Sequence, residues 1–347
     1  MKCDIVIPVW NKKQLTKRCV DHILSNTIFP YTVLLIDNAS KDDTRKYLEK
    51  TASDNPDRIK LIVNKENLGN TTAGVQGMTY GDAEYVCILD NDTIVCKDWL
   101  VEMVKVAEAS DDIGIVNPSS NTFGLRKKKM ESLEDFTGRL VRENSGKFVE
   151  IGTAVGFCYL VKRKLINEIG VWDERFSPGY FEDTEYSMRA KQKGYKSVMA
   201  LGSYVYHEEH ASFKGREKKE HFEKLFNESK EKFYKLYRKP KRMLYVIKDA
   251  KNEGFQMIKE NMYSFADAGN WIDVMMKKSD IEEIKDLNHG NIRKIFYEDS
   301  FFNVFLMFKV LTKKKKYDSI NVNSKSLLGR FEMFKKIHKA ELKLLEK

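Results

Sequence analysis

The strongest constraint on the fold of this chain is an alternation, from its first residues, between short β-branched runs and amphipathic stretches. The candidate strands are Ile5–Trp10, Val33–Asp37, Ile59–Val63, Tyr85–Asp90 and Ile113–Asn117, and helical spacing appears in Lys12–Ser25, Asp42–Ser53, Thr71–Thr79 and Asp98–Ala109. Such alternation is typical of right-handed βαβ units. It predicts an α/β fold whose mainly parallel sheet carries helices on both faces.

Polar residues follow each of the first four candidate strands. They are Asn11 after the first strand, Asp37 and Asn38 after the second, Asn64 and Asn67 after the third, and Asp90, Asn91 and Asp92 after the fourth. Ligands of open parallel sheets bind beyond the carboxyl ends of the strands. The sequence therefore predicts a site at this edge of the sheet.

The pattern changes from about Phe148 onward. Phe148–Val155 and Phe157–Val161 read as strands, and a dense polar and aromatic stretch follows. Apolar residues between Phe222 and Tyr237 mark one face of a long helix that Pro240 ends. We expect a catalytic domain of residues 1–213 and a basic, mainly helical region of residues 214–347.

Cysteine usage and hydropathy bear on the compartment. The five cysteines form no close pair, which argues against a disulfide framework or a zinc site and favours a reducing compartment. The apolar N-terminal run is too short for a secretory signal. No run of about eighteen apolar residues is present, so a membrane-spanning helix is not expected. We predict a cytoplasmic protein.

The positive charge is concentrated in the second half of the chain. Residues 214–347 hold 32 Lys+Arg against 20 Asp+Glu, whereas the remainder is close to neutral, within a total of +10. The apolar run Phe301–Leu311, the lysines Lys313–Lys316 and a basic terminal helix allow two interpretations. One is peripheral attachment to an anionic inner membrane face. The other is a helical subdomain that packs on the catalytic domain or on a second subunit. Nucleic-acid binding is not favoured, because no aromatic stacking motif accompanies the lysines.

Three segments have the composition of a catalytic site, although each has an ordinary structural explanation. Asp90-Asn91-Asp92 can hold Mg²⁺ or Mn²⁺ with substrate phosphates, or form a polar turn. Glu182 and Asp183 lie at the start of a candidate helix. One of these carboxylates can act as a general base, or both can simply interact with the helix dipole. His207 ends a candidate strand and can complete a carboxylate-rich cation site, or be a structural histidine.

The order of these segments resembles family 2 glycosyltransferases over Met1–Phe213. The nucleotide-binding half is similar in Ile5–Asn11, Ile36–Ser40, Asn67–Gly69 and Leu89–Asp92, and the acceptor half in Gly170–Phe176, Tyr180–Asp183, Arg189–Tyr195 and Val205–His207. The stretch Asn70–Gly77 departs from the glycine-rich and aromatic pattern usual there, which leaves the base and the sugar open. The resemblance implies the GT-A type of Rossmann-like fold.

The resemblance also implies a role for each matching residue. Pro8, Val9, Asn11, Asp37, Asn38, Asn67, Asp90 and Asn91 would bind the nucleotide, Asp92 and His207 would ligate Mn²⁺ or Mg²⁺, Gly156, Trp172 and Glu182 would border the sugar and acceptor, and Asp183 would be the catalytic base. The donor would be a nucleoside-diphosphate sugar. The acceptor would be a hydroxyl of a glycan, glycolipid or protein, in cell-surface polysaccharide synthesis for example.

The expected reaction is a single displacement that inverts the anomeric configuration. Two other functions use the same sheet. A nucleotide-sugar or polymer-binding protein without catalysis would not need Asp183 beside a metal site. A nucleotidyltransferase would share the metal carboxylates but release pyrophosphate in place of a nucleoside diphosphate.

Overall fold

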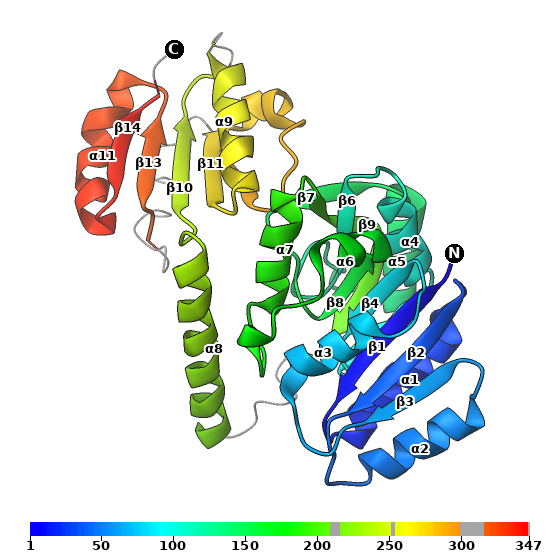
Figure 1. Cartoon of the computed structure of the whole chain (residues 1–347). Helices are drawn as coiled ribbons and strands as arrows, with labels where there is room; N and C mark the ends of the chain where they lie inside the picture. The colour runs from blue at the N-terminus through cyan, green and yellow to red at the C-terminus, as the bar shows by residue number, and fades with distance from the viewer. Residues whose placement is uncertain (209–215, 251–253, 299–315, 346–347) are drawn as a thin grey trace. The chain divides into compact units, whose positions relative to one another are not determined.

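The computed structural model describes residues 1–208, 216–250, 254–298 and 316–345. They form two compact units (Figure 1). Unit 1 comprises residues 1–149 and 153–237, and unit 2 comprises residues 150–152 and 238–347. The apolar run Phe301–Leu311 and the lysines Lys313–Lys315 lie outside the described residues.

Unit 1 is built around one mixed sheet. Its first elements are β1 (Cys3–Val9), α1 (Lys13–Asn26), β2 (Tyr31–Asp37), α2 (Thr44–Asp54), β3 (Ile59–Val63), α3 (Gly69–Thr79), β4 (Tyr85–Leu89), β5 (Thr93–Val95), α4 (Trp99–Ala107) and β6 (Ile113–Ser119). The later ones are α5 (Leu133–Asn144), β7 (Phe148–Ile151, whose last two residues fall in unit 2), β8 (Cys158–Lys162), α6 (Arg163–Ile169), η1 (Glu174–Phe176), α7 (Glu182–Gln192), β9 (Lys196–His207) and α8 (Arg216–Leu236). The strand order is β3-β2-β1-β4-β8-β6-β9-β5.

Strand β1 shows why the runs are apolar throughout. It pairs in parallel with β2 on one side and with β4 on the other. Its odd residues, such as Ile5 and Ile7, join a core with Cys19 and Ile23 of α1. Its even residue Val6 joins the opposite core, which α3 covers. A strand buried on both faces cannot alternate polar and apolar residues.

The α/β class and the mainly parallel sheet are therefore confirmed. The five strands and four helices expected before Ser120 all form, with ends that move by a few residues. Strand β5, which has three residues, is too short to show a period, and α5 was not among the expected helices although its apolar residues have helical spacing. Strand β8 is antiparallel to both β4 and β6, so the sheet is mixed.

The expected mainly helical region of residues 214–347 needs correction. Helix α8 belongs to unit 1, and the division falls after Tyr237. Unit 2 is itself an α/β unit, with β10 (Arg242–Ile247), α9 (Phe255–Asp267), β11 (Trp271–Lys277), η2 (Lys278–Ile284), β12 (Ile292–Tyr297), β13 (Ser319–Val322), α11 (Lys325–His338) and β14 (Glu341–Leu344). Its strand order is β12-β11-β10-β13-β14, and every one of these pairs is parallel.

The central strand β10 of unit 2 escaped prediction because helices cover both faces of the sheet there. Met243, Tyr245 and Ile247 of β10 pack with α9, whereas Leu244 and Val246 pack with α11. The resulting apolar run has no period of two. A short run of this kind cannot be told from a buried helical segment by periodicity alone.

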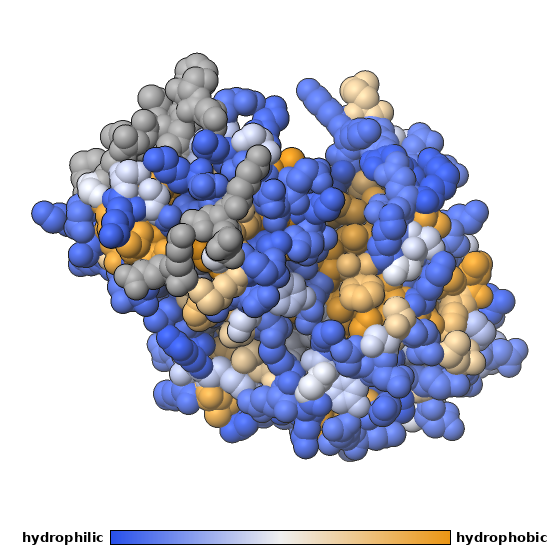
Figure 2. All heavy atoms as spheres, turned by 90° about the horizontal axis from the view of Figure 1, so that it is seen from above, coloured by the Kyte–Doolittle hydropathy of each residue, from blue (hydrophilic) through white to orange (hydrophobic). Residues whose placement is uncertain are grey.

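The surface is rich in hydrophilic residues, as expected for a chain in which 32% of the residues are charged. The face in Figure 2 is mostly hydrophilic, with apolar residues in smaller patches. Within the described residues, no helix combines the length and apolar character needed to cross a bilayer.

Two helical glycines provide a test of the packing in unit 1. A Cβ at Gly77 of α3 would lie 2.1 Å from Val6 Cγ1 of β1, whereas one at Gly138 of α5 would lie 3.3 Å from the flexible tip of Arg142. We expect Gly77→Ala to lower the free energy of unfolding by about 1–3 kcal/mol through overpacking. Gly138→Ala should raise it by up to about 1 kcal/mol. Urea midpoints of the two variants check this; a Gly77→Ala protein as stable as the wild type contradicts the close approach of α3 to β1.

Candidate functional site

Two strand ends bring Asp90 together with the two predicted metal ligands, Asp92 and His207. Asp90 and Asp92 follow β4, and His207 is the last residue of β9. Strand β5 joins them, because its Thr93 pairs with His207 in antiparallel register. The His207 Nε2 atom lies 3.2 Å from Asp92 Oδ1 and 3.7 Å from Asp90 Oδ2. All three ligand atoms lie within 4.8 Å of one another.

The backbone and the neighbouring side chains fix this group of three. The Asp90 N–H donates to the Phe157 carbonyl at 2.9 Å. The Phe157 ring stacks on the His207 ring at 5.2 Å. Asn121 accepts from the His207 N–H at 2.8 Å and donates to the His207 carbonyl at 2.9 Å. Sequence patterns did not reveal Asn121, because it lies in a loop and acts through the backbone of another residue.

Carboxylates gather at this edge of the sheet: Glu182 is buried, whereas Asp90 and Asp183 are half-buried. Burial, then Asp92 and Asp183, raise the pKa of Asp90 to about 7, against a lowering by His207. Burial, followed by Asp183 and Asp90, raises the pKa of Glu182 to about 8. Burial also raises the pKa of Asp183, which Thr184 and Gly156 partly offset by hydrogen bonding. The mutual effects among Asp90, Glu182 and Asp183 indicate that α7 and the end of β4 face one site.

The donor set fits a divalent cation. Two carboxylates and one imidazole are ligands that Mn²⁺ accepts, and Mg²⁺ prefers carboxylates together with substrate phosphates. Like charges in a half-buried site repel each other, and a dication removes that repulsion. Asp90, Asp92 and His207 are therefore the residues that would hold it, as predicted for Asp92 and His207.

Asp183 lies at the start of α7 beside a glycine. Its Oδ1 accepts from the Thr184 N–H at 2.6 Å and from the Thr184 hydroxyl at 3.1 Å. A Cβ at Gly156 would lie 3.2 Å from Asp183 Oδ2, so a side chain there would crowd the carboxylate. The glycine at position 156 therefore leaves room for the Asp183 carboxylate. The Ser187 hydroxyl donates to the Asp183 carbonyl at 2.7 Å and fixes this first turn.

Glu182 differs from its neighbour. It is 6% exposed, and its Oε2 has no hydrogen-bond partner among the described residues. With a pKa raised to about 8, its side chain is a neutral acid near pH 7 and can donate a hydrogen bond to a ligand oxygen. Its place beside the acceptor stays a prediction.

Helix α8 supports the turn that precedes α7. Tyr180 and Phe181 have φ of 73° and 70°, which is a strained region for bulky residues. The Phe181 ring packs on Phe226 and Phe233 of α8 at 5.4 and 5.3 Å. The Ser229 hydroxyl donates to the Gly179 carbonyl at 3.0 Å. Helix α8 therefore positions Glu182 and Asp183. This role could not be predicted from the sequence, because it depends on how α8 packs in the fold.

The predicted nucleotide-binding residues cluster at the ends of β1, β2 and β3. Asn11 Oδ1 accepts from the Lys41 N–H at 2.7 Å, which joins the first two loops. Asn38 donates to the Gly69 carbonyl at 3.0 Å, and Asn67 accepts from the Gly69 N–H at 3.0 Å. Asn91 donates to Thr16 at 2.9 Å. Trp10, between β1 and Asn11, is 50% exposed and offers a flat apolar surface at this edge.

Four predicted residues are more buried than direct binding requires. Asp37 is 0% exposed, and its carboxylate accepts from the Ser40 N–H at 3.0 Å and from Arg45 at 2.8 Å. Trp172 is 2% exposed and packs on Gly74 and Tyr159. The structure thus assigns Trp172 to the core and not to a substrate surface, because its ring fills the space that Gly74 leaves. Pro8 and Val9 are buried at the end of β1, so they contribute through the backbone or the shape of the loop.

Sequence comparisons find glycosyltransferases among the relatives of this chain. Residues 4–170 match the family model described as glycosyl transferase family 2. Glycosyltransferase AglE of Haloferax volcanii is 23% identical over 201 residues, 56% of this chain and 63% of the relative. The poly-β-1,6-N-acetyl-D-glucosamine synthase of Staphylococcus aureus strain COL is 24% identical over 195 residues, 55% of this chain and 46% of the relative. The chain thus spans less than two thirds of these relatives.

A solved structure supports the fold. The crystal structure of GalNAc-T7 with UDP, GalNAc and Mn²⁺ matches with a TM-score of 0.51 and 18% identity, over 60% of this chain and 44% of that one. The shared architecture is of the GT-A type, as predicted for unit 1.

The raised pKa of Asp90 gives a pH dependence of metal binding. Protons and the cation compete for this carboxylate, so the affinity for Mn²⁺ should fall as pH drops below about 7. One competing proton weakens binding by about tenfold per pH unit below the pKa. Calorimetry with Mn²⁺ at pH 8, 7 and 6 measures this, and proton release on binding should appear at pH 6. A constant dissociation constant across this range contradicts the proposed role of Asp90.

Proposed function

We propose that this chain, whose residues 4–170 match the model of glycosyl transferase family 2, is an inverting, metal-dependent glycosyltransferase. It transfers a sugar from a nucleoside-diphosphate donor to a hydroxyl acceptor. The observation that carries the proposal is the convergence of Asp183 with the cation-binding set Asp90, Asp92 and His207 at one edge of the sheet. Such a pair of functions, a base and a cation site, is what this displacement requires.

Asp183 is the general base of the proposed reaction. It takes the proton of the acceptor hydroxyl while the hydroxyl oxygen forms a bond to the anomeric carbon of the donor sugar. The bond from that carbon to the diphosphate oxygen breaks, and the nucleoside diphosphate leaves on the opposite face, so the configuration inverts. General-base assistance contributes about two to four orders of magnitude in rate. The neutral Glu182 donates a hydrogen bond that orients the acceptor.

The leaving diphosphate gains negative charge near Asp90, Asp92 and His207. A divalent cation held by these residues supplies the charge that offsets it. Without the cation, the same carboxylates would repel the diphosphate. The orienting partners Asn121 and Phe157 hold His207 in place, so the ligand geometry exists before the donor arrives.

The loops after β1, β2 and β3 form the proposed nucleotide side of the site. Asn11, Asn38 and Asn67 hold these loops together through side-chain hydrogen bonds. Asp37 shapes the loop by binding Ser40 and Arg45, and the exposed Trp10 offers a face on which a base can stack. The structure of GalNAc-T7 contains UDP, GalNAc and Mn²⁺, which supports a nucleoside-diphosphate sugar as the donor.

The acceptor is proposed to be a hydroxyl of a growing glycan, glycolipid or protein. The polysaccharide synthase among the relatives supports a glycan acceptor. Catalysis is preferred over binding alone, because a binding protein gains nothing from a base whose pKa is raised beside a cation site. Transfer of the sugar, rather than of a nucleotide, releases a nucleoside diphosphate.

Asp183→Asn should abolish transfer, because the amide cannot accept the hydroxyl proton. We expect a loss of at least about a hundredfold in kcat, with donor affinity close to that of the wild type. Asp112→Asn is the matched control, since Asp112 precedes β6 at the amino edge of the sheet and pairs with Lys196. Product analysis of each variant with a panel of nucleotide sugars measures transfer. Comparable turnover of the Asp183 and Asp112 variants would falsify the base assignment, and pyrophosphate as product would indicate a nucleotidyltransferase.

Asp92→Ala should remove the metal-dependent part of donor binding. We expect donor affinity in Mn²⁺ to fall by at least about tenfold, to the value that the wild type shows in EDTA. The exposed Asp111 provides a control substitution, Asp111→Ala, that leaves the site intact. Calorimetric titration of the donor into each protein gives the result. An Asp92→Ala protein that still responds to Mn²⁺ as the wild type does excludes Asp92 from the metal ligands.

A further inference from the structure

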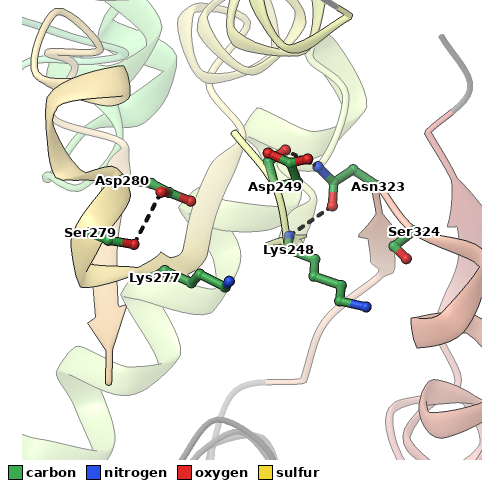
Figure 3. A pocket seen from close by; sticks show the side chains of 7 residues that line it. All are labelled: Lys248, Asp249, Lys277, Ser279, Asp280, Asn323 and Ser324. Carbon is green, nitrogen blue, oxygen red and sulfur yellow. Dashed lines mark hydrogen bonds between the residues drawn. The ribbon is translucent and has the colours of Figure 1, made fainter. Parts of the chain in front are cut away.

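Unit 2 has a pocket at the carboxyl edge of its own sheet. Seven residues line it: Lys248 and Asp249 after β10, Lys277, Ser279 and Asp280 at and after the end of β11, and Asn323 and Ser324 after β13. In Figure 3, Ser279 and Asp280 border one side and Asn323 and Ser324 the other, with Lys248 and Lys277 between them. The cavity volume is about 640 Å³. Small-molecule sites commonly measure about 300–1,000 Å³.

The strand order explains why a pocket forms there. The chain runs outward from the central strand β10 to β11 and β12, then returns to place β13 and β14 on the other side of β10. The loops after β10 and β13 therefore leave in opposite directions, because α9 and α11 cover opposite faces of the sheet. A crevice opens at such a switch point, and ligands of doubly wound sheets bind in it.

Asn323 fixes the floor of this crevice. Its Oδ1 accepts from the Lys248 N–H at 2.8 Å, and its Nδ2 donates to the Asp249 carbonyl at 2.7 Å. One side chain thus joins the loop after β13 to the loop after β10. The Lys248 ammonium donates to Ser326 at 3.0 Å, which directs it toward the first turn of α11. The pocket is preformed by these contacts.

The lining carries both signs of charge. Lys248 and Lys277 supply two cations, and Ser324 precedes the first turn of α11 without a capping side-chain hydrogen bond. Helix N-termini and ammonium groups bind phosphate oxygens. Asp280 is only 7% exposed yet borders the cavity, where its Oδ1 accepts from the Ser279 hydroxyl at 3.1 Å. A buried carboxylate that faces a cavity is an acceptor for ligand hydroxyls.

This combination selects one class of ligand. The described lining residues include no aliphatic or aromatic side chain, so neither a lipid tail nor a stacked base finds its usual partner there. An inorganic anion would bind the lysines and the N-terminus of α11, but the lining carboxylates would repel it. A molecule with hydroxyl groups at one end and a phosphate at the other satisfies both.

We propose that unit 2 holds a second ligand site, at the switch point between β10 and β13, that binds a phosphorylated sugar or polyol. Lys248, Lys277 and the first turn of α11 bind the phosphate, and Asp280 accepts hydrogen bonds from the hydroxyls. The site is separate from the residues of the proposed transferase site, so it goes beyond that function. The phosphate can belong to a free monoester or to a diester within a polymer.

Calorimetry on the full chain in EDTA tests the proposal, since EDTA suppresses cation-dependent binding at the first site. The probes are glucose 1-phosphate as monoester and glycerophosphoglycerol as diester, with glucose and inorganic phosphate as the two halves. We expect one of the phosphorylated probes to bind at least about tenfold more tightly than either half. The probe that binds identifies the source of the phosphate.

Variants locate the binding. Lys248→Ala and Asp280→Asn should each weaken it at least about tenfold, whereas Lys278→Ala, at an adjacent lysine that pairs with Glu298 outside the pocket, should not change it. Asp92→Ala should also bind normally. Thermal unfolding of each free protein checks that it is folded, and Asp280→Asn keeps the shape of the side chain. Binding that survives both pocket substitutions, that disappears in Asp92→Ala, or that no phosphorylated probe shows in the wild type overturns the proposal.

Discussion

The mutual repulsion of the carboxylates that gather at the end of β4 is the constraint on which the proposed site of unit 1 depends. Asp90, Glu182 and Asp183 each have a raised pKa, and burial is the first cause for all three. Ionising all of them in the absence of a cation is unfavourable, because each charge lies in a poorly solvated place near others of the same sign. A cation beside Asp92 reverses this balance. The free protein is therefore arranged for a state that it reaches only with its ligands, as expected of a catalytic site.

Holding such a group together requires support from outside the loops. The antiparallel pairing of β5 with β9 brings His207 to the end of β4. On the other side, α8 packs its aromatic residues on Phe181 and binds the Gly179 carbonyl through Ser229. These contacts stabilise positive φ values that cost of order 1–3 kcal/mol each in bulky residues. The strain is local to the turn that presents Asp183, which is where a fixed geometry matters most for proton transfer.

The sequence predicted the parts of this arrangement that depend on local pattern or on motif. The strand runs gave the α/β class, and the ordered motifs gave Asp90, Asp92, Asp183 and His207 as one group. Asn121 and α8 were not predictable as parts of the site, since their contacts join segments far apart in the chain and leave no periodic signal. Trp172 was assigned to the substrate surface because it lies in a motif, but it is buried and packs in the core. The individual binding roles of the residues at the nucleotide edge stay predictions.

Unit 2 shows how a physical rule can succeed where pattern recognition fails. Its strands are short, and its central strand β10 is apolar on both faces, so periodicity did not reveal the sheet. Once the strand order is known, the position of a pocket follows from the topology. The pocket lies where the order reverses, and it is lined by the polar residues that directly follow three strands. No sequence motif distinguished Lys248 and Asp280 from the other charged residues of this basic segment. The fold makes them candidate ligand-binding residues, because parallel strands place their carboxyl ends side by side. Two residues about thirty positions apart in the sequence therefore line one cavity.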